Sequence, residues 1–596
     1  MSHTPSEIAE SWLHTFDERL RSRDINGAAK LFQNHGFWRD FVSFTWNIKT
    51  FEGSAEIEAM LDSTLDRVQP SGWTLLEAAE GDEHEVDAWV GFDTAQARGK
   101  AHLRLRDGKA WTLLTTMEEI RGHEEHAGSH RDLGVRHEVV KGRRSWLEQK
   151  VDREERLGRD EQPYTLIVGG GQNGINLAAR LGRLGVPAIV VDKKARPGDN
   201  WRSRYKSLHL HDPVWFNHMP YMRYPDSWPV FPSKDKVGDW LEAYTNIMEI
   251  NYWANTECVK ARYDAESDSW SVDVVRDGEH ITLRPRQLVI ALGVSGYPHI
   301  PAFDGAEDFA GAQHHSSQHS GGGDWSGKRA VVIGSNNSAH DIAADLWEHG
   351  ADVTMLQRSS TMIARSGSLV EYAFAPLYTE DAVKNGISLE KADMLASSIP
   401  LRMAPDVQKP IYEKIADHDA EFYAQLREAG FALDFGDDDS GLHMKYLRRG
   451  SGYYIDVGAS QLIIDGHVKL RQGQVSKITE SAIVLDDGTK VEADVIVYAT
   501  GYGSMNAWLA DLISPEVADQ VGKCWGYGSD TTKDPGPWEG ELRNMWKPTN
   551  VENLWIHGGN FSQGRQFSKY LALQIKARME GLDTKVYGLQ PSHHTR

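Results

Sequence analysis

In the first 125 residues, apolar residues recur with two different spacings. Apolar residues follow helical spacing in "EIAESWLHTFDERLRSRD", residues 7–24, and in "GSAEIEAMLDSTLDRVQ", residues 53–69. Apolar and polar residues alternate, as in half-buried strands, over 87–95, 99–108 and 110–120. Helices first and strands afterwards predict an α+β domain with a curved antiparallel sheet over a few helices.

A glycine-rich turn follows the apolar run "YTLIVGG", residues 164–170, and precedes the helical pattern "INLAARLGRLG". Gly169, Gly171 and Gly174 form G-x-G-x-x-G, which permits a tight turn and brings a pyrophosphate close to a helix N-terminus. A second strand, "PAIVVDKK", ends in Asp192, which suits a ribose diol. The pattern predicts a dinucleotide-binding fold. Its further candidate cofactor-binding residues are Gln172, Asn173 and Lys193.

The same order of strand, turn, helix and strand recurs over residues 328–360. Gly334 is kept, whereas Asn336 and Ala339 replace the other two glycines. The second strand ends in Gln357-Arg358-Ser359 instead of an acid, and a guanidinium beside a hydroxyl can hold a ribose 2′-phosphate. This predicts NADPH, with NADH tolerated, and two nucleotide folds indicate hydride transfer to a flavin. The candidate residues here are Gly334, Ser335, Asn336, Asn337, Ser338, Arg358 and Ser359.

Composition removes several classes of function. A formal net charge of −21 argues against nucleic acid as a partner, and Cys258 and Cys524 are too few for a disulfide framework. The N-terminus lacks a signal-peptide pattern and no apolar run approaches the length of a membrane span, so we expect a cytoplasmic protein. His315 and His319 have no evident third ligand, so we expect no metal site.

Further stretches resemble the flavin-containing monooxygenases and their Baeyer–Villiger relatives, over about residues 163–580. "FAGAQHHSSQH", residues 309–319, is similar to the pattern F-x-G-x-x-x-H-x-x-x-(Y/F/W), with His319 in the place of the last aromatic. "ALGVSGYPHIPAFDG" and "DVIVYATGYGS" look like the two junctions between nucleotide domains. "WRSRYKSLHLHDPVWF", residues 201–216, is similar to the flavin-side segment of plant indole-3-pyruvate monooxygenases.

The resemblance implies two Rossmann-like dinucleotide-binding domains, for FAD and NADPH, preceded by an α+β cone-like domain. The domains would be 1–125, similar to nuclear transport factor 2; 126–162, a charged linker with one helix; 163–325, FAD-binding; 326–490, NADPH-binding with a helical insertion; and 491–596, the second FAD-binding part. The extra domain and His319 look like the type II subgroup, which is associated with Baeyer–Villiger oxidation.

The implied activity is a monooxygenase that uses FAD, NADPH and O2 and inserts one oxygen atom into a small molecule through a flavin C4a-hydroperoxide. Implied FAD-side residues are Asn200, Trp201, Arg202, His209, Thr500, Gly501 and Tyr502. His211 is a catalytic candidate beside the flavin, and a structural buried histidine is the alternative. Baeyer–Villiger chemistry needs a fixed cation to stabilise an oxyanion. Candidates are Lys445, Arg448 and Arg449, with a solvated basic patch as the alternative.

Several alternatives stay open. The reaction could be Baeyer–Villiger oxidation of a ketone, oxygenation at nitrogen or sulfur, or oxidative decarboxylation of a 2-oxo acid. The N-terminal domain could cover the active site with the aromatic stretch at residues 36–51, mediate a homodimer, or sense a small ligand.

Overall fold

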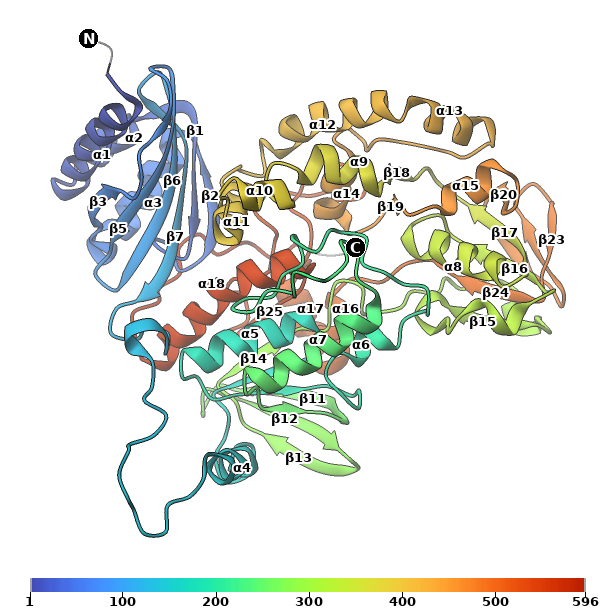
Figure 1. Cartoon of the computed structure of the whole chain (residues 1–596), viewed down its shortest axis with the longest axis horizontal. Coiled ribbons are helices and arrows are strands. Elements are labelled where there is room, and N and C mark those ends of the chain that lie inside the picture. Colours follow the sequence, from blue (N-terminus) through green and yellow to red (C-terminus); the bar gives the residue numbers. More distant parts are fainter. Residues whose placement is uncertain (1–2, 594–596) are drawn as a thin grey trace.

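An N-terminal unit of curved sheet and helices stands at the left of Figure 1, which shows the computed structural model; the structure describes residues 3–593. Its strand order is β2-β1-β7-β6-β5-β3, and β4 pairs with β5. The two helices and three strands expected from periodicity are confirmed. The elements are α1 Pro5–Arg21, α2 Ile25–Ala29, β1 Phe32–Phe41, β2 Ile48–Glu52, α3 Gly53–Val68, β3 Ser71–Leu75, β4 Glu80–Gly81, β5 Glu85–Asp93, β6 Ala97–Arg106 and β7 Lys109–Ile120.

Two expectations for this unit are wrong. Strands β1 and β2 precede α3, so helices do not all come before strands, and β1 pairs with β7 in parallel, so the sheet is not wholly antiparallel. Residues 36–41 of β1 are buried at every position. A strand covered on both faces shows no alternation of apolar and polar residues, which hid β1 from the sequence pattern.

A parallel five-stranded sheet, in the order β10-β9-β8-β14-β25, forms the first nucleotide-binding fold. Helices α5 and α18 pack together beside it, and an antiparallel sheet of β11, β12 and β13 adds to the same hydrophobic core (Figure 1). The elements are α4 Trp146–Arg156 in the linker, β8 Thr165–Val168, α5 Gln172–Arg183, β9 Ala188–Val191, α6 Asp199–Arg202, α7 Lys234–Ile247, β10 Tyr252–Trp253, β11 Thr256–Asp264, β12 Ser269–Arg276, β13 Glu279–Leu283, β14 Gln287–Ile290, α16 Asn506–Leu512, α17 Pro515–Val521, β25 Leu554–Ile556 and α18 Phe561–Met579.

A second parallel sheet has the order β15-β24-β16-β17-β20, with α8 after β16. The two Rossmann-like folds expected from the sequence are therefore confirmed. The elements of the second fold and its insertion are β15 Ala312–His315, β16 Arg329–Ile333, α8 Asn337–Glu348, β17 Asp352–Gln357, β18 Met362–Arg365, α9 Ser366–Ser368, α10 Glu380–Lys384, α11 Leu389–Ser397, α12 Ala404–His418, α13 Ala420–Glu428, α14 Gly441–Arg449, β19 Tyr453–Asp456, α15 Ala459–Ile464, β20 Lys469–Gln472, β21 Val475–Ile478, β22 Ala482–Leu485, β23 Lys490–Glu492 and β24 Val495–Tyr498.

The boundaries between the two folds differ from those expected. Both β15 and β24 pair in the second sheet, although the sequence analysis gave 163–325 and 491–596 to the FAD-binding domain. The chain crosses between the sheets before residue 312 and after residue 498. β15 escaped notice because it is a short edge strand of sequence AQHH and lacks the apolar run of a central strand.

The N-terminal sheet packs directly on α18. Phe41 contacts Phe567 and Tyr570, with ring centroids 5.5 and 5.0 Å apart. Arg39 donates two hydrogen bonds, of 2.6 and 2.7 Å, to the carboxylate of Glu541, and both side chains are buried. Trp46 and Ile48 belong to the same core as the first sheet, whereas Trp38 and Phe44 lie in the core of the N-terminal unit. This packing removes the basis for interpreting residues 36–51 as the wall of an open cleft.

Among residues 3–593, no helix is both long and apolar enough to cross a membrane.

Replacing Arg39 by Met should reduce the free energy of unfolding by about 3–5 kcal/mol, because it leaves the buried carboxylate of Glu541 without its partner. Denaturant titration followed by circular dichroism measures the change. The control is Arg98→Met, since Arg98 and Glu119 form an exposed pair and their loss should leave the midpoint nearly unchanged. Equal midpoints for both variants would contradict the importance of the buried contact.

Candidate functional site

The glycines of the first turn have distinct physical roles. Gly169 has φ +111°, and a Cβ there would lie 2.5 Å from the carbonyl oxygen of Ala291. A Cβ on Gly174 would lie 2.0 Å from the oxygen of Gly169, so the turn itself requires both glycines. Gly171 caps α5 with φ −75°, and a Cβ there would meet only the end of the Asn200 side chain. Gly171 therefore leaves space for a ligand at the N-terminus of α5.

The acid predicted beside this turn is hydrogen-bonded to the backbone of the turn. Asp192 accepts hydrogen bonds from the backbone N–H groups of Gly170 and Lys194, at 2.7 and 2.8 Å. Lys193 is exposed, and Gln172 accepts a bond of 3.2 Å from the indole N–H of Trp201. The side-chain amide of Asn173 donates to the carbonyl of Gly559, which ties the turn to the N-terminal end of α18.

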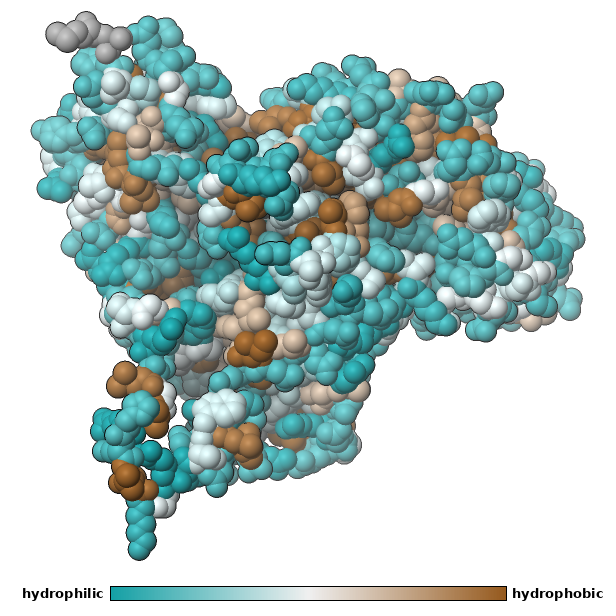
Figure 2. Space-filling view, viewed as in Figure 1, coloured by the Kyte–Doolittle hydropathy of each residue, from teal (hydrophilic) through white to brown (hydrophobic). Residues whose placement is uncertain are grey.

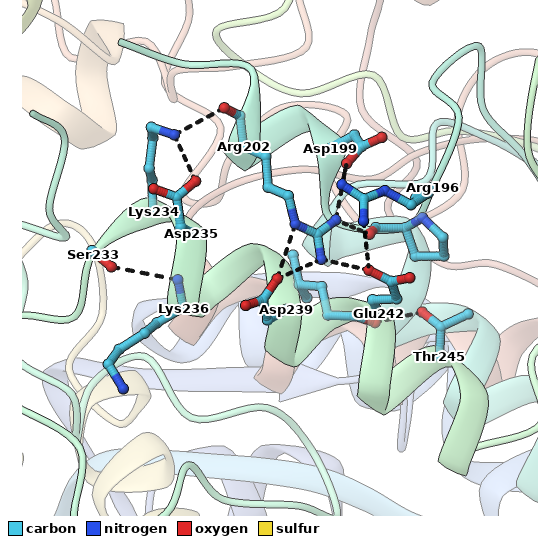
Figure 3. A network of polar contacts seen from close by, with 12 residues as sticks. Arg196, Asp199, Arg202, Ser233, Lys234, Asp235, Lys236, Asp239, Glu242 and Thr245 are labelled. Atoms are coloured by element: carbon cyan, nitrogen blue, oxygen red, sulfur yellow. Dashed lines mark hydrogen bonds and ion pairs between the residues drawn. The ribbon is translucent and has the colours of Figure 1, made fainter. Parts of the chain in front are cut away.

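Arg202 has a structural environment that the sequence analysis did not foresee. Figure 3 shows its guanidinium facing Asp199, Asp239 and Glu242, with nearest N···O distances of 2.9, 2.9 and 2.6 Å. Three carboxylates satisfy its charge and hold α6 on α7. Its interpretation as a cofactor ligand has no support from this geometry, whereas Trp201 stacks on Phe561 at the start of α18.

His211 connects the first fold to α8. Its Nε2 lies 3.2 Å from the carboxylate of Asp341, which also accepts a 2.5 Å bond from the hydroxyl of Tyr205. Burial opposes the charged imidazole, but Asp341 outweighs it and raises the pKa of His211. His209 is exposed and its Nδ1 lies 3.0 Å from the carbonyl of Ser207. His211 thus forms an ion pair between folds, which differs from a histidine satisfied by backbone.

A groove of about 990 Å³ opens beside this ion pair. The segment 207–211, α8, residues 365–371 and residues 454–462 line it. It therefore lies where the flavin-side segment, the second fold and the insertion meet.

The second turn also meets the requirements of its pattern. A Cβ on Gly334, where φ is +132°, would lie 2.3 Å from the carbonyl oxygen of Ala499. Ser335 bonds to Thr361, and Asn337 accepts a bond from the backbone of Ile455. Asn336 caps α8, and Ser338 lies in its first turn.

Two neighbouring residues at the end of β17 have different environments. Gln357 is buried and exchanges two hydrogen bonds with the backbone of Ala432, at 2.8 and 2.9 Å. Arg358 and Ser359 are exposed, and Arg358 has no hydrogen-bond or ion-pair partner within the described part of the chain. Arg358 is therefore available to an anionic ligand, as the sequence predicts.

The two junction segments lie side by side. The backbone of His299 donates to the carbonyl of Gly501, and Thr500 donates 2.5 Å to the carbonyl of His299. His315 lies 3.0 Å from the carbonyl of Gly501, and its ring contacts Tyr502 edge-on. The prediction that these stretches carry the chain between folds is confirmed.

His319 has a structural partner too. Its Nε2 lies 3.0 Å from the buried carboxylate of Asp345. No cluster of three or more potential metal ligands occurs between residues 3 and 593.

Two of the three candidate cations are bound in ion pairs. Lys445 pairs with Asp434, and Arg448 makes two bonds, of 2.9 and 2.7 Å, to Asp438. Burial lowers the pKa of Lys445, while Asp434 offsets part of that effect. Arg449 is half-buried and donates to the carbonyl of Ser451, with no carboxylate partner in the region described. Only Arg449 fits the role of an available cation.

Sequence reasoning missed a group of side chains that we call the inner group: Asp212, Tyr446 and Tyr453. Burial raises the pKa of Asp212 to about 6, although the side chain keeps some accessible surface. Asp212 directly follows His211, which lines the groove.

The charge of Asp212 connects the inner group. Burial raises the pKa of Tyr446 and of Tyr453, and the negative charge of Asp212 adds to both shifts. The Tyr446 hydroxyl donates 2.6 Å to Gln563 and accepts from the backbone of Asn560, at the N-terminus of α18. No motif marks these residues, but Asp212 directly follows the candidate His211, and Tyr453 lies shortly after the candidate Arg449.

Two nucleotide-binding sheets joined by paired junctions, each with a glycine turn at a helix N-terminus, define a flavoprotein oxidoreductase of the two-dinucleotide type. Residues 166–400 match the pyridine nucleotide-disulphide oxidoreductase family model. Indole-3-pyruvate monooxygenase YUCCA1 of Oryza sativa subsp. japonica is 29% identical over 351 residues, covering 59% of this chain and 79% of the relative. Probable indole-3-pyruvate monooxygenase YUCCA9 of Arabidopsis thaliana is 30% identical over 349 residues, covering 58% and 76%.

The open crystal structure of cyclohexanone monooxygenase has the same fold, with a TM-score of 0.50, 16% identity and coverage of 70% of this chain and 87% of that one. The chain belongs to the flavin-containing monooxygenase family, whose members use FAD and NADPH. The predicted class of enzyme and its cofactors are thereby confirmed. The type II subgroup and the likeness to nuclear transport factor 2 stay predictions.

Replacing Gly171 by Leu should abolish FAD retention while leaving the fold intact, since the backbone there is ordinary and the side chain would fill ligand space. Gly174→Ala should instead destabilise the flavin-free protein, because its Cβ meets backbone. Flavin absorbance per chain and thermal melting measure the two effects. A full complement of FAD in Gly171→Leu would refute this placement.

Replacing Arg358 by Ala should weaken NADPH about tenfold to a hundredfold and NADH little, because only NADPH carries a 2′-phosphate. Steady-state KM values for both coenzymes measure this. Arg471→Ala is a matched control, since Arg471 is an exposed arginine on the neighbouring strand β20. Equal weakening of both coenzymes by Arg358→Ala would place its guanidinium away from the 2′-phosphate.

Proposed function

We propose that this monooxygenase oxidises a neutral ketone to an ester or lactone, in a Baeyer–Villiger reaction, and that it disfavours 2-oxo acids. The observation that carries the proposal is the charge of the inner group. Asp212 places a poorly solvated carboxyl one residue from His211, which lines the groove, while Asp434 and Asp438 neutralise Lys445 and Arg448.

A 2-oxo acid carries its own carboxylate, which needs a cation to replace the water it loses on binding. Asp212 would repel that group because both carry negative charge. A neutral carbonyl compound meets no such penalty. The inner group therefore favours a ketone over the substrate class that the names of the plant relatives indicate.

The two turns fit the two cofactors. Gly171, Asn200 and the N-terminus of α5 would hold the FAD pyrophosphate, with Asp192 at its ribose. The N-terminus of α8 and Arg358 would hold NADPH. When bound, the cofactors supply electrons and activate O2.

Arg449 supports a carbonyl substrate in particular. Attack on a ketone places negative charge on its oxygen, and a guanidinium without a carboxylate partner can stabilise that charge. Oxygenation at nitrogen or sulfur develops no such oxyanion on the substrate, so Arg449 would have no comparable task there. The filled interior of the N-terminal unit, where Trp73 stacks on Phe92 at 4.6 Å and Phe32 on Trp38 at 5.7 Å, counts against a ligand-sensing role.

A substrate panel tests the reaction class. Ketones, thioethers and 2-oxo acids of matched size are incubated with holoenzyme, NADPH and O2, and products are identified by mass spectrometry. We expect esters or lactones from ketones at a higher kcat/KM than any product from the other two classes. A preference for sulfoxide formation or for release of CO2 would refute the proposal.

Replacing Asp212 by Asn should raise the ratio of 2-oxo acid to ketone turnover at least about tenfold at pH 7.5, roughly the effect of removing a like charge. The carboxyl gains its charge as pH rises through about 6, so wild-type selectivity should relax below pH 6 and sharpen above it. The variant should show no such dependence. The exposed substitution Asp226→Asn is the control, and an unchanged ratio in Asp212→Asn would remove Asp212 from the substrate space.

A further inference from the structure

The linker contains a projecting segment, residues 131–147, that we call the arm. At its start, the backbone of His126 donates 2.8 Å to Arg183, and after α4 the residue Leu157 packs on the main core. Between these two points the chain leaves the body and returns, as the loop beside α4 in Figure 1 shows. Every residue of the arm is exposed.

The arm makes its polar contacts within the linker itself. Arg143 donates to the carbonyls of Arg136 and Glu138, and Arg144 pairs with Asp152. Across residues 3–593, no hydrogen bond or ion pair joins residues 131–147 to any residue outside 126–152. The body of its own chain therefore does not fix the arm.

Large apolar side chains are concentrated on the arm and on the first turns of α4. Val139 and Leu133 are 104% and 87% exposed, and Trp146 and Leu147 are 58% and 59% exposed. Figure 2 shows brown side chains on this projection. A protein surface seldom leaves such a concentration uncovered, and an exposed apolar patch beside charged residues is typical of an interaction site.

Charge identifies the partner. Residues 131–144 contain five Arg or Lys and two Asp or Glu, whereas the whole chain has a net charge of −21. A basic arm is complementary to another copy of so acidic a chain. An anionic membrane would attract the arm but repel the body, which disfavours lipid as the partner.

We propose that the arm packs on a second copy of this chain in a homodimer, with the two arms exchanged around a twofold axis. A twofold axis brings equivalent surfaces of the two copies together. The arm of one copy therefore contacts the other copy at the surface next to the point where that copy's own arm leaves the body. Next to α4, exposed Ile247 ends α7, and Glu249 follows it at 4.0 Å from Arg153 of α4. Ile247 offers the apolar residues of the arm an exposed apolar contact there, and the acidic total charge of the chain attracts its basic residues.

The first experiment measures the mass of the full-length holoenzyme by size-exclusion chromatography with light scattering, over the micromolar range. We expect a dimer. The double variants Val139→Asp/Val140→Asp and Arg143→Glu/Arg144→Glu should each raise the dimer dissociation constant at least about tenfold while the flavin content stays unchanged. Val259→Asp, at a 50% exposed valine on β11, is the matched control and should remain dimeric.

Three outcomes would overturn the inference. The wild-type protein could be a monomer throughout the range, or its dimer could be insensitive to both arm variants. The protein could also bind vesicles of phosphatidylserine and phosphatidylcholine through the arm while remaining monomeric, which would make the arm a membrane contact. The inference does not depend on which substrate the enzyme oxidises.

Discussion

The burial of α18 between two sheets is the constraint on which the rest of the structure depends. Its residues pack on α5 and the first sheet, and Phe567 and Tyr570 receive Phe41 of the N-terminal sheet. A helix covered on all sides must satisfy its polar groups internally. Arg565 does so by bonding to both oxygens of Asp393 in the insertion and to the carbonyls of Phe216 and His218. One buried guanidinium thus holds together α18, the insertion and the flavin-side segment.

Pairing of buried charges also determines which basic side chains remain able to bind an anion or stabilise a negative charge. Burial of an unpaired ion is costly, so Arg202, Lys445 and Arg448 carry carboxylate partners. Arg358 and Arg449 remain without one in the described chain; Arg358 follows β17, and Arg449 ends α14. A basic residue is therefore available to a ligand only where no neighbouring carboxylate already pairs with it.

The sequence predicted features that depend on local backbone geometry. Both glycine turns were predictable because Gly169, Gly174 and Gly334 each face a backbone oxygen at close range, which only glycine tolerates. The roles of charged residues were not predictable in the same way. Asp239 lies 37 positions from Arg202 in the sequence, and only the packing of α6 on α7 brings them together. Asp212 was missed because its neighbours in the fold are tyrosines far along the chain. Strand β1 was missed because it is buried on both faces and so lacks the alternation of apolar and polar residues.

The N-terminal unit is connected to Tyr446 by packed aromatic side chains. A row of aromatic contacts leads from Phe41 to Phe567, then to Trp546 at 4.1 Å, to Trp525 and to Tyr446. The indole of Trp525 also donates 2.8 Å to the carbonyl of Tyr446. The Tyr446 hydroxyl accepts a hydrogen bond from the backbone of Asn560, which caps α18, so the N-terminal sheet and Tyr446 both contact this helix or its cap. The N-terminal unit is therefore part of the close-packed interior that positions α18.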